Sequence, residues 1–197
     1  MVKRLVLPVL LACALAPAAH AAGGRYVFAG GTHAQRGQVT AALNASSFDW
    51  SLVPGQIVIH IGKGTSAHAV AGQIWLDGGL LDTGRFSWGV VQHEYAHQVD
   101  FGLLNDPMRS QLEPLLEGSS WWGSLGQHAQ LGCERFAAEL TWAYWQSPDN
   151  VMKPSNATGA VGQMAPSAFR AALASVLGVE PVRRIASIQG TRLPRKG

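Results

Sequence analysis

Cysteine is nearly absent from this sequence, since Cys13 and Cys133 are the two cysteines among its 197 residues. Two cysteines cannot build a disulfide framework, and Cys13 lies in an N-terminal segment that we expect to be removed. Stability must therefore come from a hydrophobic core, for which 47% hydrophobic residues suffice. A lone cysteine in a helix is more often a small buried residue than a metal ligand or a thiol switch, so Cys133 is assigned no role.

Charged residues are also scarce, at 14% of the chain, and their distribution excludes a broad basic surface. Without the two basic residues of the N-terminal segment, 13 basic residues face 12 acidic ones and the formal charge falls from +3 to +1. Five of those 13 lie in the C-terminal stretch 183–197, which we expect to be a solvated basic tail. This balance argues against a nucleic-acid partner.

After the N-terminus the chain has no long hydrophobic run, and no stretch approaches the ~20 apolar residues that a membrane-spanning helix needs. Residues 1–21 show a basic start, an apolar run over 5–16 and an Ala-x-Ala cleavage site at 19–21, which is typical of a secretory signal peptide. We expect a secreted protein that begins at Ala22 and does not insert stably into a membrane. A lipid anchor at Cys13 is a less favoured alternative, because the apolar run continues past it.

The order of the expected elements predicts an α+β fold, with a small mixed N-terminal sheet followed by a helical half. No internal repeat or long linker divides the chain, so 22–182 is expected to form one domain. Strand-like runs come first, at Arg25–Ala29, Gln56–Ile61 and Gly72–Asp77. Helical patterns are expected at Val39–Leu43, Trp88–Phe101, Pro107–Glu117, Leu131–Trp145 and Pro166–Leu177. The strand at Gly72–Asp77 is a candidate free edge, to which a peptide could add.

The helix expected at Trp88–Phe101, with Gly102 as its stop, contains the HExxH pattern, from His93 to His97. Residues four apart in a helix lie one turn above each other, with Cβ atoms about 5–6 Å apart, so the two imidazoles can bind one metal ion. Glu94 would then reach a water at the metal, which is the position of a general base. The pattern predicts a zinc cofactor held by His93 and His97 and the hydrolysis of a peptide bond with Glu94 as the base.

A catalytic zinc site takes three protein ligands and a water. The third histidine of the metzincin pattern is absent, because Leu103 stands six residues after His97. The remaining candidates are Glu134 and Glu139, both on the helix expected at Leu131–Trp145. Residues five apart point about 140° from each other, so the two glutamates cannot face the same metal, and helix geometry does not choose between them.

The wider pattern is similar to the catalytic domain of anthrax toxin lethal factor and related gluzincins. It comprises an HExxH helix ending in H-x-V-D, a connecting helix and loop, and E-x-F-A on a second helix. The matching residues are His93, Glu94, His97, Val99, Asp100, Glu134, Phe136 and Ala137. The resemblance spans roughly 90–177 and implies a zincin-like fold with Glu134 as the third zinc ligand. The chain departs from the family at Ala138, which is often acidic there, and lacks the tyrosine that precedes the glutamate helix of lethal factor.

Four further residues near the motif are candidates for supporting roles. His128 could stabilise the oxyanion of a tetrahedral intermediate in place of the missing tyrosine, or be a surface histidine. Asp100 shares the helix face of the two histidines and could orient a ligand imidazole; alternatively it could solvate the helix end or pair with Arg135. Trp121 and Trp122 could line a substrate cleft or pack in the core. Three other histidines are expected to be structural: His33, His60 and His68.

These observations predict a secreted zinc metalloendopeptidase that acts on peptides or proteins, with a monomer as the favoured state. The alternative is a secreted cell-envelope domain with a binding or structural role, in which a metal is structural or absent.

Overall fold

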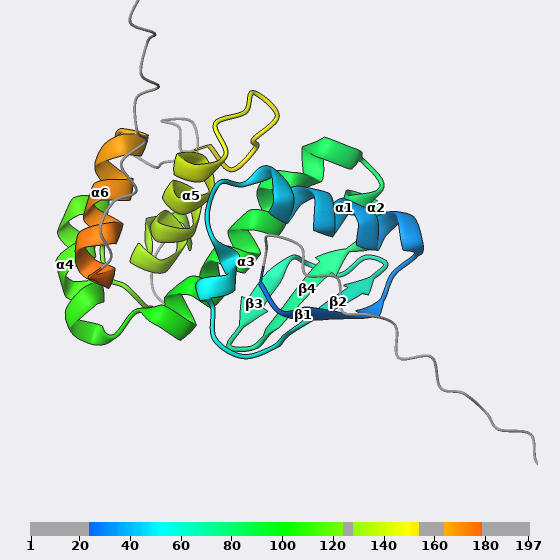
Figure 1. Ribbon diagram of the computed structural model, residues 1–197, viewed down its shortest axis with the longest axis horizontal. Helices are drawn as coiled ribbons and strands as arrows, with labels where there is room; N and C mark the ends of the chain where they lie inside the picture. Colours follow the sequence, from blue (N-terminus) through cyan, green and yellow to red (C-terminus); the bar gives the residue numbers. More distant parts are fainter. Residues whose placement is uncertain (1–23, 124–127, 154–163, 179–197) are drawn as a thin grey trace, which may run out of the picture.

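The protein adopts an α+β fold in which a small mixed sheet is followed by a mostly helical half, as the element order predicts (Figure 1). The structure, a computed structural model, describes residues 24–123, 128–153 and 164–178. The expected signal peptide, Cys13 and the basic tail lie outside these ranges. Within them, no helix combines the length and apolarity needed to cross a membrane.

The N-terminal half contains the sheet and the helices beside it. Its elements are β1 (Tyr26–Gly30), α1 (His33–Ala45), β2 (Ile57–Gly62), β3 (His68–Val70), β4 (Gln73–Asp77) and α2 (Gly78–Leu81). Two residues cap the start of α1. The side chain of Thr32 accepts a hydrogen bond from the backbone N–H of Gln35, and the Gln35 side chain accepts one from the N–H of Thr32. This reciprocal capping satisfies two backbone donors that a helix start leaves open.

The second half is helical. It contains α3 (Trp88–Leu103), α4 (Asp106–Leu116), α5 (Gly132–Tyr144) and α6 (Pro166–Leu177). The predicted start of α4 is confirmed, since the Asn105 side chain accepts a hydrogen bond from the backbone N–H of Met108 at 3.0 Å. The predicted end of α6 is also confirmed, because Gly178 takes up the left-handed conformation that terminates many helices.

The strand order is β1-β2-β4-β3, so the expected free edge at β4 is wrong. β1 pairs with β2 and β2 with β4 in parallel, whereas β3 pairs with β4 in antiparallel fashion, with Ala69 opposite Ile74. The sequence pattern missed β3 because three residues are too few to show an alternation. Gly72, at a φ of +80°, makes the tight turn that folds β3 back onto β4. The free edge on this side of the sheet is therefore β3.

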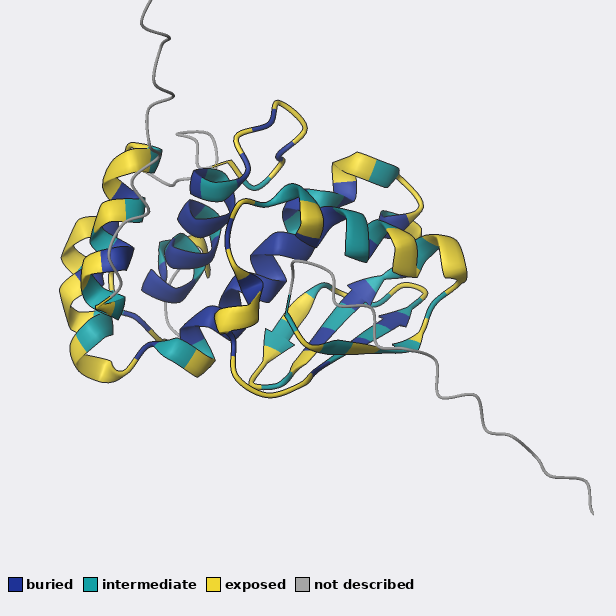
Figure 2. Cartoon of the chain, in the orientation of Figure 1, coloured by how far each residue is buried: buried dark blue, intermediate teal, exposed yellow. Residues whose placement is uncertain are grey.

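One face of the sheet forms the core under α1 and α3. Alternate residues of β2 and β4 are buried, as the period of two along a strand requires: Ile57, Ile59, Ile61, Ile74 and Leu76. The opposite face carries more exposed residues (Figure 2).

Helix α3 is buried along almost its whole length and lies between the sheet half and α5 (Figures 1 and 2). It extends one residue beyond Gly102, so the predicted stop at Gly102 is wrong. A Cβ at this position would lie 2.8 Å from Cδ of Pro54. The glycine is therefore needed for close packing against the preceding loop and does not end the helix.

The start of α5 is tied to the loop at Ser120 and Trp121 by main-chain hydrogen bonds. The N–H of Gly132 donates to the carbonyl of Ser120 at 2.7 Å, and the N–H of Cys133 donates to the carbonyl of Trp121 at 3.2 Å. A Cβ on Gly132 would lie 2.9 Å from the Trp121 ring. The contact fixes where the helix with the candidate glutamates begins.

Gly132→Ala is expected to lower the free energy of unfolding by about 1–3 kcal/mol, because the new methyl group overlaps the Trp121 ring and main chain. Gly37→Ala is the matched control. Gly37 is exposed within α1 and nothing lies within 4 Å of its missing Cβ, so alanine there should stabilise the protein by about 0.5–1 kcal/mol. Urea unfolding of both variants measures the change in the free energy of unfolding. Equal changes in the two variants would contradict this packing.

Candidate metal centre

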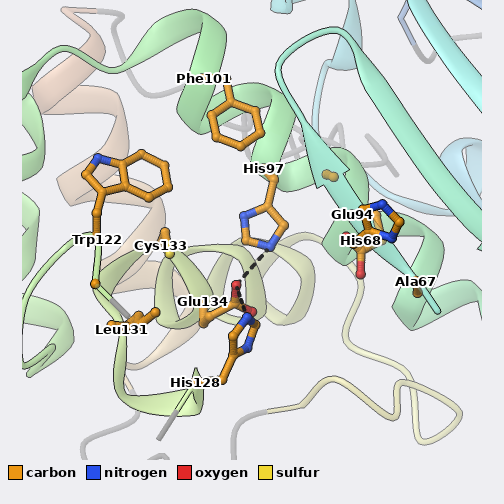
Figure 3. Close-up of a pocket in the computed structure, with 12 residues that line it drawn as sticks. Ala67, His68, Glu94, His97, Phe101, Trp122, His128, Leu131, Cys133 and Glu134 are labelled. Carbon is orange, nitrogen blue, oxygen red and sulfur yellow. Dashed lines mark ion pairs between the residues drawn. The ribbon is translucent and has the colours of Figure 1, made fainter. Parts of the chain in front are cut away.

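Three side chains from two helices converge on one point: His93 and His97 of α3 and Glu134 in the first turn of α5. Figure 3 shows His97 and Glu134 pointing toward each other. The Nε2 atom of His93 lies 3.1 Å from Oε2 of Glu134, and the Nε2 atom of His97 lies 3.4 Å from Oε1. The candidate ligand atoms all lie within 4.8 Å of one another. Of the two glutamates that the sequence left open, Glu134 is the one that contacts both imidazoles.

The spacing of these atoms fits a metal ion. Zinc bonds of about 2.0–2.1 Å in a tetrahedral site place ligand atoms roughly 3.3 Å apart. The observed nitrogen-to-oxygen distances are 3.1 and 3.4 Å, each to a different carboxylate oxygen of Glu134, and the three candidate ligand atoms lie within 4.8 Å of one another. Two histidines and one carboxylate are also a donor set of catalytic zinc sites, which keep a fourth position open. This buried group could therefore hold a metal ion.

Electrostatics favour the charged form of the glutamate. Burial opposes ionisation of Glu134, but the hydrogen bonds from His93 and His97 and their charges outweigh it and hold its pKa well below the usual range. Burial lowers the pKa of His93, and neutral imidazole is the form that binds a metal. Burial also acts to lower the pKa of His97, but the hydrogen bond to Glu134 and nearby carboxylates raise it overall.

Glu94 lies beside this group in the same cavity and is buried. Burial raises its pKa from an ordinary value near 4.5 to about 7, with the charges of His97 and Glu134 acting in opposite directions. A carboxyl group with a pKa near neutral can accept and return a proton at physiological pH. Glu94 is therefore a candidate to exchange a proton in this cavity.

The cavity above these residues encloses about 290 Å³. Its walls come from four segments: the edge of the sheet at 67–69, one face of α3, the loop at 122–123, and residues from His128 to the start of α5. This volume is close to the lower end of the range for ligand sites.

His128 lies at the rim of the cavity. Its side chain is 80% exposed, and its Nε2 atom lies 3.4 Å from Oε1 of Glu134. His128 is therefore a surface histidine that also lies next to the candidate metal centre.

Asp100 does not orient a ligand imidazole in the described part of the chain. Its Oδ1 atom accepts a hydrogen bond from Nε of Arg109 at 2.9 Å, and its Oδ2 atom accepts one from Nε1 of Trp121 at 3.0 Å. The ion pair expected with Arg135 is also wrong, because Arg109 reaches Asp100 from α4. A partner on another helix cannot be read from spacing along α3.

The two tryptophans have different environments. Trp121 is buried and bonded to Asp100, whereas Trp122 is 48% exposed and lines the cavity. The Trp122 ring stacks on Phe101 with centroids 5.8 Å apart, and Phe101 stacks on His97 at 6.2 Å. Core packing is therefore confirmed for Trp121, whereas Trp122 lines the cavity.

Sequence reasoning missed two residues that line the cavity. His68, expected to be structural, reaches it from β3 and stacks on Trp75 at 4.6 Å, with Nδ1 2.8 Å from the carbonyl of Ser66. Phe101 carried a usable signal, since it stands four residues after His97 and shares its helix face. Cys133 also lines the cavity, and burial raises the pKa of its thiol to about 12, which favours the protonated thiol at neutral pH.

Comparisons of the chain with protein-family models, with curated proteins and with solved structures found no match. The geometry by itself thus defines the class of site: a buried group of two histidines and a glutamate, with a second carboxyl group in the same cavity.

Replacing Glu134 should weaken metal binding far more than replacing Glu139. Glu134→Gln removes a charged ligand, so zinc affinity should fall by more than the roughly 10–100-fold that loss of an outer-shell partner costs. Glu139→Gln is the matched control, because Glu139 lies on the same helix and accepts a hydrogen bond from the backbone N–H of Met164. Competition with a zinc chelator measures both affinities. An equal loss in the two variants would rule out this ligand set.

Glu139 also predicts a pH dependence of stability. Burial raises its pKa from near 4.5 to about 7, so the folded state holds a proton that the unfolded state has already released between these values. Its contribution to the free energy of unfolding therefore falls as pH rises from about 4.5 to 7. Glu139→Gln, which cannot ionise, should be the more stable protein at pH 8, by up to about 3 kcal/mol, and nearly equal to the parent at pH 4.5. Urea unfolding at both pH values tests this, with the exposed Glu117→Gln as control.

Proposed function

We propose that the protein is a secreted zinc metallopeptidase of the zincin type, with His93, His97 and Glu134 as ligands. One observation carries the proposal: an HExxH helix is buried with its two imidazoles against a glutamate from a second helix, and its own glutamate lies in the same cavity. The resemblance to gluzincins implies the same third ligand from sequence alone. The two arguments are independent, because one uses motif order and the other uses distances.

The residues of the site suit hydrolysis of a peptide bond. Zinc, when bound, supplies a Lewis acid for the scissile carbonyl and for the attacking water. The oxygen of that water bonds to the carbonyl carbon while Glu94 takes one of the water's protons. The carbon–nitrogen bond then breaks, and Glu94 returns the proton to the leaving amine. His128, whose Nε2 atom lies 3.4 Å from Oε1 of Glu134, would donate a hydrogen bond to the oxyanion that develops on the carbonyl oxygen.

The free edge of β3 provides a place for the substrate main chain. β3 pairs with β4 along one side, and residues 67–69 line the cavity next to Glu94. An extended peptide can add to such an edge through main-chain hydrogen bonds, which would carry its carbonyl groups past the candidate zinc site. This arrangement replaces the edge that the sequence assigned to β4.

Glu94→Gln should abolish hydrolysis without releasing zinc. The substitution keeps the shape of the side chain and removes the base, so kcat/KM on a peptide library should fall by at least about 100-fold. Elemental analysis should give about one zinc per chain in parent and variant alike. Glu113→Gln, on α4 and outside the cavity, is the control for the loss of a carboxylate.

Two results would contradict the proposal. A folded parent that takes up no zinc on titration would favour the alternative, a secreted domain with a structural or binding role. A Glu94→Gln variant that cleaves as fast as its parent would show that the motif is not catalytic.

A further inference from the structure

The cavity beside the candidate metal centre has two chemically different ends. One end is polar and contains Glu94, His97 and Glu134. The other is largely apolar and is formed by Phe101, Trp122 and Leu131. Figure 3 shows Trp122 and Phe101 on the far side of His97 from Glu94. A molecule bound at the metal would therefore extend a neighbouring group along the aromatic end.

The aromatic end is held in place on two sides. The Trp122 ring stacks on Phe101 with an angle of 8° between the ring planes, and the guanidinium of Arg109 lies 5.3 Å from the ring centroid. Arg109 is itself held by Asp100 and Asp106, each at 2.9 Å. Trp121, the preceding residue, is bonded to the same buried Asp100. Asp100 thus positions Trp122 in two ways. It binds the preceding residue, Trp121, and it holds Arg109, the cation that lies on the Trp122 ring.

This construction leaves a large aromatic side chain 48% exposed at the edge of a catalytic-type site. An exposed aromatic surface gains free energy when an apolar group covers it, and aromatic rings add a favourable stacking or edge-on contact. The chemistry of the lining thus selects a bulky apolar or aromatic group.

We propose that Trp122, with Phe101 and Leu131, forms the subsite for an aromatic or large apolar side chain of the peptide substrate, next to the scissile bond. The proposal deepens the proposed function and rests on metal binding by His93, His97 and Glu134. Trp122 is the specificity-determining residue, since it is the most exposed part of the apolar end.

The test uses two small zinc-binding probes that differ by one benzyl group, acetohydroxamate and 3-phenylpropanohydroxamate. The hydroxamate anchors both probes at the metal, and the phenyl arm of the second can reach the aromatic end. Calorimetric titration of the zinc-loaded protein should show at least tenfold tighter binding of the phenyl probe. Trp122→Ala should reduce that preference to less than threefold and leave acetohydroxamate affinity unchanged, while Trp122→Phe should retain most of it.

Trp142→Ala is the matched control, because Trp142 lies on α5, contacts Lys153 and does not line the cavity. It should keep the full preference, and an equal loss in this variant would overturn the subsite. A parent that binds both probes equally would also overturn it, even if the protein cleaves peptides. A parent that prefers the phenyl probe but cleaves no peptide would uphold the subsite and refute the peptidase function. Absence of zinc binding would refute both.

Discussion

The burial of polar side chains on α3 is the constraint on which the rest of the structure depends. A buried polar group destabilises a fold unless it is hydrogen-bonded, and this helix buries six: Gln92, His93, Glu94, His97, Gln98 and Asp100. Within the described part of the chain, four neighbouring elements supply partners to five of these side chains, all except Glu94. The carbonyl of Ala42 in α1 accepts a hydrogen bond from Gln92, and main-chain groups of the β3–β4 hairpin bond to Gln98. Arg109 of α4 binds Asp100, and Glu134 of α5 contacts His93 and His97. The helix thereby joins the sheet to the helical half.

The same burial separates the chemistry of two carboxyl groups in one cavity. Glu134 is half-buried against two imidazoles, which hold its pKa low and favour its charged form, the form that binds a metal. Glu94 is buried without such bonds, and its pKa rises to about 7. Two carboxyl groups with opposite shifts are a frequent basis for dividing tasks within an active site. Here the division follows from which of them contacts the histidines.

The aromatic end of the cavity depends on a different buried charge. Asp100 is fully buried, and it is bonded to Trp121 and to Arg109, the cation that lies over Trp122. One carboxylate near the end of α3 thus organises one wall of the cavity, while the histidines one and two turns earlier belong to the candidate metal centre beside it. The helix that carries the proposed chemistry therefore also positions the residues that would select a substrate.

Local order along the chain determined the α+β class, most of the helices and the one-turn spacing of His93 and His97, because helix and strand periods are properties of neighbouring residues. The resemblance to gluzincins added Glu134, which periodicity could not separate from Glu139. The tertiary structure alone decided that β3 covers β4, that Arg109 and not Arg135 pairs with Asp100, and that His68, Phe101 and Trp122 meet in one cavity. These contacts join residues distant in sequence or depend on how helices pack, and no spacing rule within a segment encodes the partner that another segment will supply.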